Sequence, residues 1–72
     1  MRDELLFKIG QSIRYIRLKK ELSQEELGFK SDLSTNALSA IERGNYNIRI
    51  KTLYRIADAL NVKVEEILNC NF

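Results

Sequence analysis

Residues 23–44 read Ser-Gln-Glu-Glu-Leu-Gly-Phe-Lys-Ser-Asp-Leu-Ser-Thr-Asn-Ala-Leu-Ser-Ala-Ile-Glu-Arg-Gly, and the pattern of this stretch decides the fold. Ser23 is followed three residues later by Glu26, a spacing typical of a capping box, in which each side chain bonds the backbone N–H of the other residue. We therefore expect a helix to begin at Gln24. The Ser-Asp pair at residues 31–32 favours a turn and should end that helix.

A second short helix is expected after this turn. Ser34 can cap its start, the helix should cover residues 35–43, and Gly44 stands where a left-handed helix stop is expected. Helical spacing places three apolar residues on one face: Ala37, Leu38 and Ile41. The same spacing places five other residues on the opposite face: Thr35, Asn36, Ser39, Ala40 and Arg43. Two such helices form a helix-turn-helix pattern, whose second helix enters the DNA major groove in proteins that bind DNA.

The outer face of the second helix suits close contact with DNA bases. It carries short hydrogen-bonding side chains, one small apolar residue and one arginine, and Glu42 lies at its edge. Asn36 can pair bidentately with adenine, Ala40 can contact a thymine methyl group, and Arg43 can reach a guanine or a phosphate. We predict base contacts by five residues: Thr35, Asn36, Ser39, Ala40 and Arg43. The alternative is that these side chains form an ordinary solvated helix face.

Three motifs carry a resemblance to a known family. Residues 22–27, Leu-Ser-Gln-Glu-Glu-Leu, open the first helix, and residues 41–44, Ile-Glu-Arg-Gly, close the second. They are preceded by residues 9–17, Ile-Gly-Gln-Ser-Ile-Arg-Tyr-Ile-Arg. In these motifs the chain resembles the Cro/phage-repressor (XRE) family of DNA-binding domains, over residues 9–68. The resemblance implies an all-α fold, a compact five-helix bundle in which residues 1–72 form a single domain with a central helix-turn-helix.

Apolar spacing predicts three further helices, over about residues 3–20, 50–60 and 64–69. Asp3 can cap the first of them. Gly10 weakens that helix and is tolerable where another helix passes close to it. Ten apolar residues are expected to face inward: Leu6, Ile9, Ile13, Ile16, Leu53, Ile56, Ala57, Leu60, Ile67 and Leu68. Two residues of the middle helix are expected to face outward: Tyr54 and Arg55.

The size and composition fit one globular domain. The chain has 72 residues, of which 44% are hydrophobic and 31% are charged. No apolar run approaches the length of a membrane span, and the residues after Met1 lack a signal-peptide pattern. The lone cysteine, Cys70, excludes an internal disulfide and fits a reducing cytoplasm, which is the expected location.

The residues that most chemistry requires are missing from the sequence. It contains no histidine, no cysteine pair and no glycine-rich phosphate loop. Neighbouring acidic residues, such as Glu25 and Glu26, lie near predicted helix starts, where the helix dipole explains them. Catalysis by Cys70 would need an activating base, and none is evident. We therefore expect no enzyme, no cofactor, no metal site and no small-molecule ligand.

Basic and amide side chains flank the predicted helix-turn-helix. The net charge of +2 indicates little by itself, and basic runs at residues 14–20 and 43–55 can be solvated faces or phosphate contacts. The resemblance implies that Arg17 pairs with Glu42 and that Gln24 contacts a phosphate, although Gln24 is also a good first helical residue. Seven residues are candidate phosphate contacts: Arg17, Gln24, Ser34, Asn45, Tyr46, Asn47 and Arg49. For Tyr46, packing on its own loop is an equal alternative, and for Arg17 the structural pair comes first.

These features predict a sequence-specific transcriptional regulator that binds double-stranded DNA as a homodimer. One recognition helix reads few base pairs, so two copies about 34 Å apart would read a near-palindromic operator. In many members of the family that the chain resembles, the dimer surface lies on the last helices, here residues 50–69. The candidate dimer residues are Leu60, Val62, Val64, Leu68 and Phe72. The alternative is that all of them belong to the core.

Two other functions are compatible with the same pattern. The helices can serve a protein-interaction module, such as an antitoxin or anti-repressor, or a nucleic-acid binder without sequence preference. Within the regulators, the run at residues 47–53 and the lengthened first helix are similar to the controller proteins of restriction-modification systems. A phage-type switch is the other member of the family that fits a chain of this size.

Overall fold

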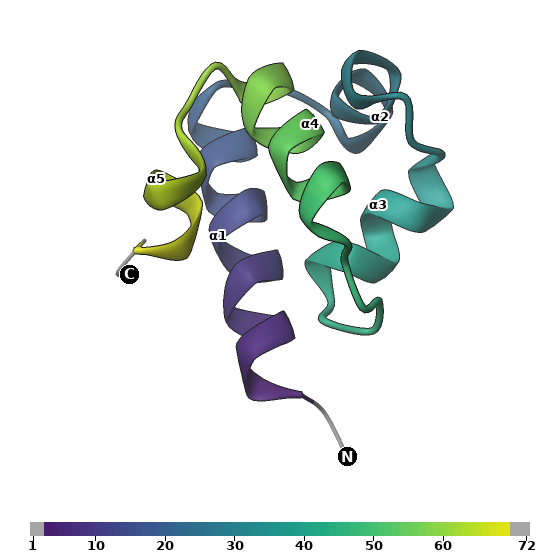
Figure 1. The fold of residues 1–72 in the computed structure, drawn as a ribbon. Helices are drawn as coiled ribbons and strands as arrows, with labels where there is room; N and C mark the ends of the chain where they lie inside the picture. The colour runs from purple at the N-terminus through teal and green to yellow at the C-terminus, as the bar shows by residue number, and fades with distance from the viewer. Residues whose placement is uncertain (1–2, 70–72) are drawn as a thin grey trace.

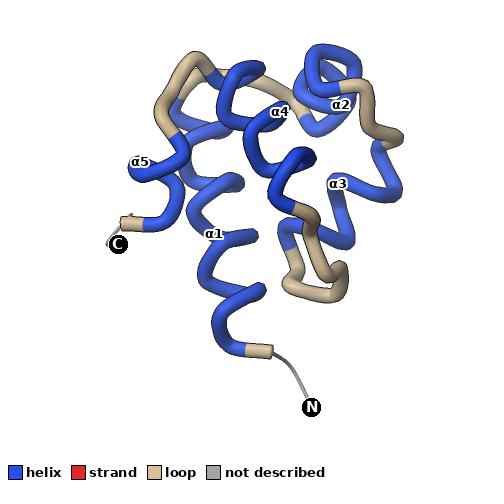
Figure 2. The backbone as a smooth tube through the Cα atoms, viewed as in Figure 1, coloured by secondary structure: helices blue, strands red, loops and turns tan. Residues whose placement is uncertain are grey.

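The computed structural model describes residues 3–69 and shows five helices around one core (Figure 1). The described residues contain no strand, and Figure 2 shows short loops between all the helices. The all-α five-helix prediction is thereby confirmed. The helices are α1 (Glu4–Lys19), α2 (Gln24–Ser31), α3 (Thr35–Glu42), α4 (Ile50–Leu60) and α5 (Val64–Leu68).

Side-chain caps start the first three helices where the sequence predicted them. The Asp3 carboxylate accepts the backbone N–H of Leu6 at 3.1 Å. Ser23 and Glu26 form the complete capping box, because each side chain accepts the backbone N–H of the other residue at 2.9 Å. The Ser34 hydroxyl accepts the N–H of Ala37 at 3.0 Å. These bonds satisfy amides that lack partners within a helix, so each start is fixed locally.

Residues with positive φ follow the C-terminal ends of the first four helices. Gly44 has φ 77°, as expected for a residue that stops α3. Glu21, Asp32 and Asn61 also adopt positive φ, near 59°, where an L side chain costs conformational energy. Asp32 and Asn61 are among the residues that tolerate this region, whereas Glu21 is not.

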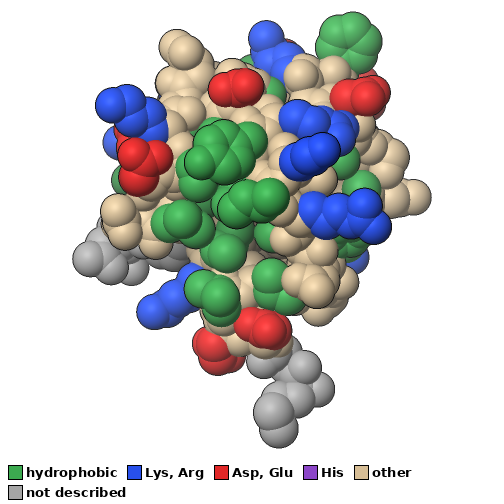
Figure 3. All heavy atoms as spheres, in the orientation of Figure 1, with side chains coloured by type: hydrophobic (Ala, Val, Ile, Leu, Met, Phe, Trp, Pro, Cys, Tyr) green, Lys and Arg blue, Asp and Glu red, His purple; other side chains and the backbone are tan. Residues whose placement is uncertain are grey.

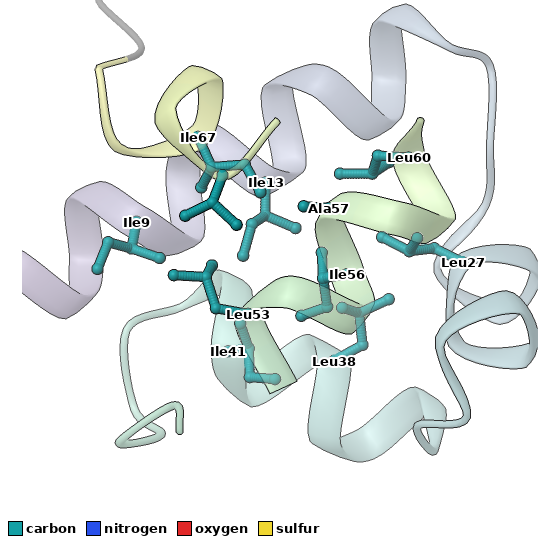
Figure 4. Packing of buried hydrophobic residues seen from close by; sticks show 11 residues of the cluster. Ile9, Ile13, Leu27, Leu38, Ile41, Leu53, Ile56, Ala57, Leu60 and Ile67 are labelled. Carbon is teal, nitrogen blue, oxygen red and sulfur yellow. The ribbon is translucent and has the colours of Figure 1, made fainter. Parts of the chain in front are cut away.

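The core collects inward residues from all five helices, and Figure 4 shows how they interlock. Ile13, Leu27 and Leu38 are fully buried and join α1, α2 and α3. Leu68, predicted to face inward, is instead 51% exposed, because the single-turn helix α5 already places Ile67 toward the core. Eleven residues form the core: Ile9, Ile13, Leu27, Leu38, Ile41, Leu53, Ile56, Ala57, Leu60, Val64 and Ile67.

Gly10 lets α3 approach the backbone of α1. A Cβ atom at Gly10 would lie 2.2 Å from the carbonyl oxygen of Ile41 and 2.7 Å from that of Glu42. Real Cβ contacts are never this close, so a larger residue would force the two helices apart. The condition under which the sequence made this glycine tolerable, the close passage of another helix, is therefore met by α3.

Candidate nucleic-acid interface

Helix α3 has a buried face and an exposed face, in the phase that the sequence predicted. Leu38 and Ile41 lie in the core. Thr35, Asn36 and Arg43 are exposed, and the smaller Ser39 and Ala40 between them are partly exposed. The helix lies at the side of the molecule opposite α5, so its outer face is not covered by its own subunit (Figure 1).

Ser39 and Arg43 interact one helical turn apart on this exposed face. Nη1 of Arg43 donates a hydrogen bond to the Ser39 hydroxyl. A guanidinium group has five N–H donors, so this bond orients the group and leaves other donors for a partner. Two of the five predicted base-contact residues therefore form one unit at the C-terminal end of α3.

A buried ion pair joins this end of α3 to α1, as the family resemblance implied. Nε of Arg17 lies 2.7 Å from Oε2 of Glu42, and Nη2 lies 3.1 Å from Oε1. Nη1 donates to the carbonyl oxygen of Leu22 at 2.8 Å. The two charged side chains are only 8% and 3% exposed. The Arg17 guanidinium faces inward, so its role is structural, and the phosphate contact considered from the sequence is corrected on this ground.

Gln24 joins the same network from the start of α2. Its Nε2 donates to Oε1 of Glu42 at 3.0 Å, and the side chain is partly buried. The Glu42 carboxylate thus accepts three hydrogen bonds, two from Arg17 and one from Gln24. The sequence offered two roles for Gln24, a first helical residue and a phosphate contact, and did not indicate this third one. The contact holds the start of α2 against the end of α3.

The remaining phosphate candidates lie at two places beside α3. Ser34 is exposed at its start, and the loop after its end carries Asn45, Tyr46, Asn47 and Arg49, all exposed. This loop is anchored to α3 because the N–H of Asn45 donates to the carbonyl oxygen of Ala40 at 2.9 Å. Polar groups therefore flank both ends of the exposed face of α3.

Arg55 is exposed, as the sequence predicted, and it also holds the helix-turn-helix turn to α4. Its Nε and Nη2 donate to the carbonyl oxygen of Ser31 at 3.1 and 2.8 Å, and Nη2 also donates to that of Asp32 at 2.8 Å. These carbonyl groups belong to the end of α2, where a cation is favourable. No local pattern could have shown this contact, because Arg55 and Ser31 are 24 residues apart.

Comparison with known proteins agrees with this geometry. The family model described as Helix-turn-helix matches residues 13–67. The chain belongs to the helix-turn-helix family. It is 37% identical over 70 residues to the control protein C.BamHI of Bacillus amyloliquefaciens, covering 96% of this chain and 86% of that one. It is 40% identical over 60 residues to the immunity repressor of Bacillus phage phi105, covering 83% of this chain and 42% of the repressor.

Solved structures of helix-turn-helix regulators share the fold. The restriction-modification controller protein C.AhdI from Aeromonas hydrophila superposes with a TM-score of 0.84 at 37% identity, covering 86% of this chain and 94% of that one. The wild-type controller C.Esp1396I superposes with a TM-score of 0.86 at 38% identity, covering 93% and 90%. The protein is thus a DNA-binding regulator of transcription and not an enzyme.

The structure corrects the predicted dimer surface of this helix-turn-helix protein. Leu60 is fully buried and Val64 is 7% exposed, because their helical phase turns them into the core. Val62 packs partly against the core, Leu68 is exposed, and Phe72 lies outside the described residues, as does Cys70. Leu60 and Val64 are therefore removed from the expected surface.

Other large apolar side chains are exposed on α4 and α5, which follow the helix-turn-helix, and at the start of α1. Ile50 and Tyr54, four residues apart on α4, are 66% and 56% exposed, and Leu5 near the start of α1 is 66% exposed. Together with Leu68 they are the exposed large apolar side chains of α4, α5 and the start of α1, and we call this set the apolar face: Leu5, Ile50, Tyr54 and Leu68. Figure 3 shows hydrophobic side chains grouped in the middle of the side that carries α4 and α5. The sequence signal for these exposed side chains was the pair Ile50 and Tyr54 on α4, which lies outside the inward-facing stripe of that helix.

The capping box of α2 also affects a titratable group. The hydrogen bonds from the backbone and side chain of Ser23 lower the pKa of Glu26, and the nearby positive charge of Lys30 lowers it further. Glu26 is therefore held in its charged form at the positive end of the α2 dipole. This carboxylate serves the fold of the helix-turn-helix and lies outside its exposed recognition face.

The described part of the chain has neither a membrane-spanning helix nor a cluster of metal-ligating side chains. None of the helices between residues 3 and 69 is long and apolar enough to cross a membrane. Within the same residues, no three histidine, cysteine, aspartate or glutamate side chains come together as metal ligands would.

Proposed function

We propose that this protein binds operator DNA sequence-specifically by placing α3 in the major groove. The observation that carries this proposal is the two-faced character of α3. Its exposed side presents five short or cationic side chains, while its buried side is fixed by Leu38, Ile41 and the Glu42 network. A rigid helix that presents such groups can discriminate base pairs through hydrogen bonds and methyl contacts. The base contacts are Thr35, Asn36, Ser39, Ala40 and Arg43.

Phosphate contacts on both sides of α3 would orient the helix in the groove. Gln24 and the backbone amides at the start of α2 lie on one side, close to Glu42 at the end of α3. Ser34 and the loop at residues 45–49 supply exposed hydroxyl, amide and guanidinium groups. Such contacts set the register of a protein on the duplex without reading its sequence.

The homodimer would form through the apolar face defined above. Exposed apolar groups on neighbouring helices favour association, and the face is separate from α3. The subunit measures 29 × 24 × 21 Å, and α3 lies opposite α5, so a pair joined near α4 and α5 would hold its recognition helices far apart (Figure 1). This arrangement supports a spacing of about 34 Å, one turn of DNA, on a near-palindromic site. Together with the controller proteins among its relatives, it favours a controller-type regulator. A DNA-binding regulator of this family would act in the cytoplasm.

Selection of bound duplexes from a random pool tests the proposal. We expect one near-palindromic sequence to be enriched, and its affinity to fall steeply with salt concentration. Asn36→Ala should relax the preference at one base pair per half-site. Equal weakening on every sequence would instead identify a nucleic-acid binder without preference. Failure to bind DNA at low salt would leave the protein-interaction module, such as an antitoxin or anti-repressor, as the function.

Sedimentation of a surface variant tests the dimer separately. Tyr54→Glu adds a charge to the apolar face and should shift the protein toward monomer at micromolar concentration. Lys51→Glu changes a neighbouring exposed residue of α4 outside that face and should leave the dimer intact. Identical sedimentation of both variants would place the dimer surface elsewhere.

A further inference from the structure

The last backbone carbonyl group of α3 is bonded by a side chain from α1. The carbonyl oxygens of a helix end lack partners within the helix. In α3, those of Ala40 and Ile41 accept the N–H groups of Asn45 and Gly44. The carbonyl oxygen of Glu42 instead accepts Nε2 of Gln11 at 3.1 Å, although the two residues are 31 positions apart.

Gln11 acts where α1 and α3 are already closest. The neighbouring Gly10 leaves no room for a Cβ atom against the same Glu42 carbonyl oxygen. The Glu42 carbonyl group is therefore contacted from α1 in two ways, by the backbone at Gly10 and by the side-chain amide of Gln11. Together these contacts define both the distance and the direction of the C-terminal end of α3 relative to α1.

The Gln11 contact differs in charge and burial from the Arg17–Glu42 ion pair. Arg17 is buried and charged, so its loss would leave the Glu42 carboxylate buried without a full partner. Gln11 is neutral and only partly buried, so its loss leaves one backbone carbonyl group at the edge of solvent. Removing Gln11 should therefore change how α3 is held without unfolding the protein.

We propose that Gln11 is a positioning residue that sets the C-terminal end of α3 for base-pair discrimination. This inference rests on the proposed function, in which α3 reads bases. Arg43 directly follows Glu42, whose carbonyl group Gln11 bonds, and its guanidinium is hydrogen-bonded to Ser39 one turn earlier. Thr35 and Asn36 lie at the other end of the helix, where the Ser34 cap holds the backbone. Loss of Gln11 therefore affects the base pairs read by Arg43 and spares those read by Asn36.

The test compares discrimination at individual base pairs. The probes are the duplex selected by the wild-type protein and its single-base-pair variants. Arg43→Ala and Asn36→Ala first identify the base pairs that each residue reads. Gln11→Met, which keeps the side-chain length but removes the donor, should lower discrimination about fivefold at the Arg43 base pairs. Discrimination at the Asn36 base pairs should stay within about twofold, and the salt dependence should be unchanged.

One control and one second variant separate positioning from general stability. Leu18→Met introduces the same side chain at an exposed site of α1 and should leave every affinity unchanged. Gln11→Asn shortens the side chain and should lower discrimination at the same base pairs, so it replaces Gln11→Met if that variant melts below the assay temperature. Equal loss of affinity for all duplexes, or unchanged discrimination in folded Gln11 variants, would overturn the inference.

The outcomes also distinguish this inference from the proposed function. If the wild-type protein prefers no duplex, the proposed function fails, and the role of Gln11 fails with it. If the wild-type protein shows a preference that Gln11→Met and Gln11→Asn retain in full, base reading by α3 stands and the positioning role alone is wrong.

Discussion

The helix-turn-helix is attached to the rest of the molecule at two places that differ in chemistry. The end of α3 meets α1 through the buried pair Arg17–Glu42 and the close approach at Gly10. The turn after α2 meets α4 through Arg55, which is exposed and donates hydrogen bonds to the carbonyl groups of Ser31 and Asp32. The first attachment excludes water and tolerates little change, whereas the second is screened by solvent. We therefore expect mutations to be costly at the first and mild at the second.

The largest effect is expected from Arg17→Ala. Its loss strands the Glu42 carboxylate in a site where the side chain is 3% exposed. Breaking a buried pair in this way should lower the free energy of unfolding by about 3–5 kcal/mol, measured by urea denaturation. Arg14→Ala, at an exposed site on the same helix, is the control and should change it by less than about 0.5 kcal/mol. Similar values for the two variants would mean that the pair is not a rigid attachment.

Gly10→Ala should have the second-largest effect on the free energy of unfolding, with a sign opposite to the one that helix propensity predicts. Helix propensity alone predicts a gain of about 1 kcal/mol, because alanine favours a helix more than glycine does. The new Cβ atom would meet the Ile41 carbonyl oxygen at 2.2 Å, so we expect a loss of about 1–3 kcal/mol instead. Thermal unfolding measures the difference. A higher melting temperature for Gly10→Ala would show that α3 can shift without cost.

At the second attachment, Arg55→Met should lower the free energy of unfolding by about 1 kcal/mol. The substitution keeps much of the apolar stem and removes the three hydrogen bonds to the end of α2. Lys51→Met, one turn earlier on α4, is the matched control and should be nearly neutral. Asp32→Asn should also be nearly neutral, since its carboxylate lies 3.8 Å from Arg55 and both are exposed. If Arg55→Met lowered the free energy of unfolding as much as Arg17→Ala, the two attachments would not differ in strength.

The smallest effect is a pH dependence at the start of α2. The folded-state pKa of Glu26 lies below its ordinary value of 4.5, so its contribution is fully present above pH 4.5. It is lost as the pH falls through the lower folded-state value, because the protonated carboxyl group binds the Ser23 amide less well. Glu26→Gln should therefore flatten part of the decline in urea midpoint between pH 5 and pH 3. If Glu26→Gln and the wild type showed the same dependence of the urea midpoint on pH, the acid sensitivity would not come from Glu26.

Local features of the sequence predicted much of this structure. The Asp3, Ser23 and Ser34 caps and the Gly44 stop depend on residues within a few positions, so their patterns are readable before folding. The two faces of α3 follow from helical spacing in the same way. The pairing of Arg17 with Glu42 required the family resemblance, because 25 residues separate the partners.

The errors arose where a residue's environment depends on another helix. Leu60 and Val64 were assigned to a dimer surface and lie in the core, whereas Leu68 was expected inward and is exposed. Apolar character is the same in both places, so composition cannot tell a core residue from a surface one. Arg55 is exposed as predicted, but its contact with the turn was not foreseen, since its partner is a backbone carbonyl group, which every residue has.

The sequence by itself determined the helix starts, the helix-turn-helix and the group of side chains on the outer face of α3. Its short-range patterns do so because hydrogen bonds at helix ends and helical periodicity involve neighbours along the chain. The tertiary structure decided that Gln11 and Gly10 meet the end of α3, that Arg55 holds the turn, and which apolar residues stay exposed. Those outcomes depend on how the helices pack, and packing brings together backbone groups and side chains far apart in sequence.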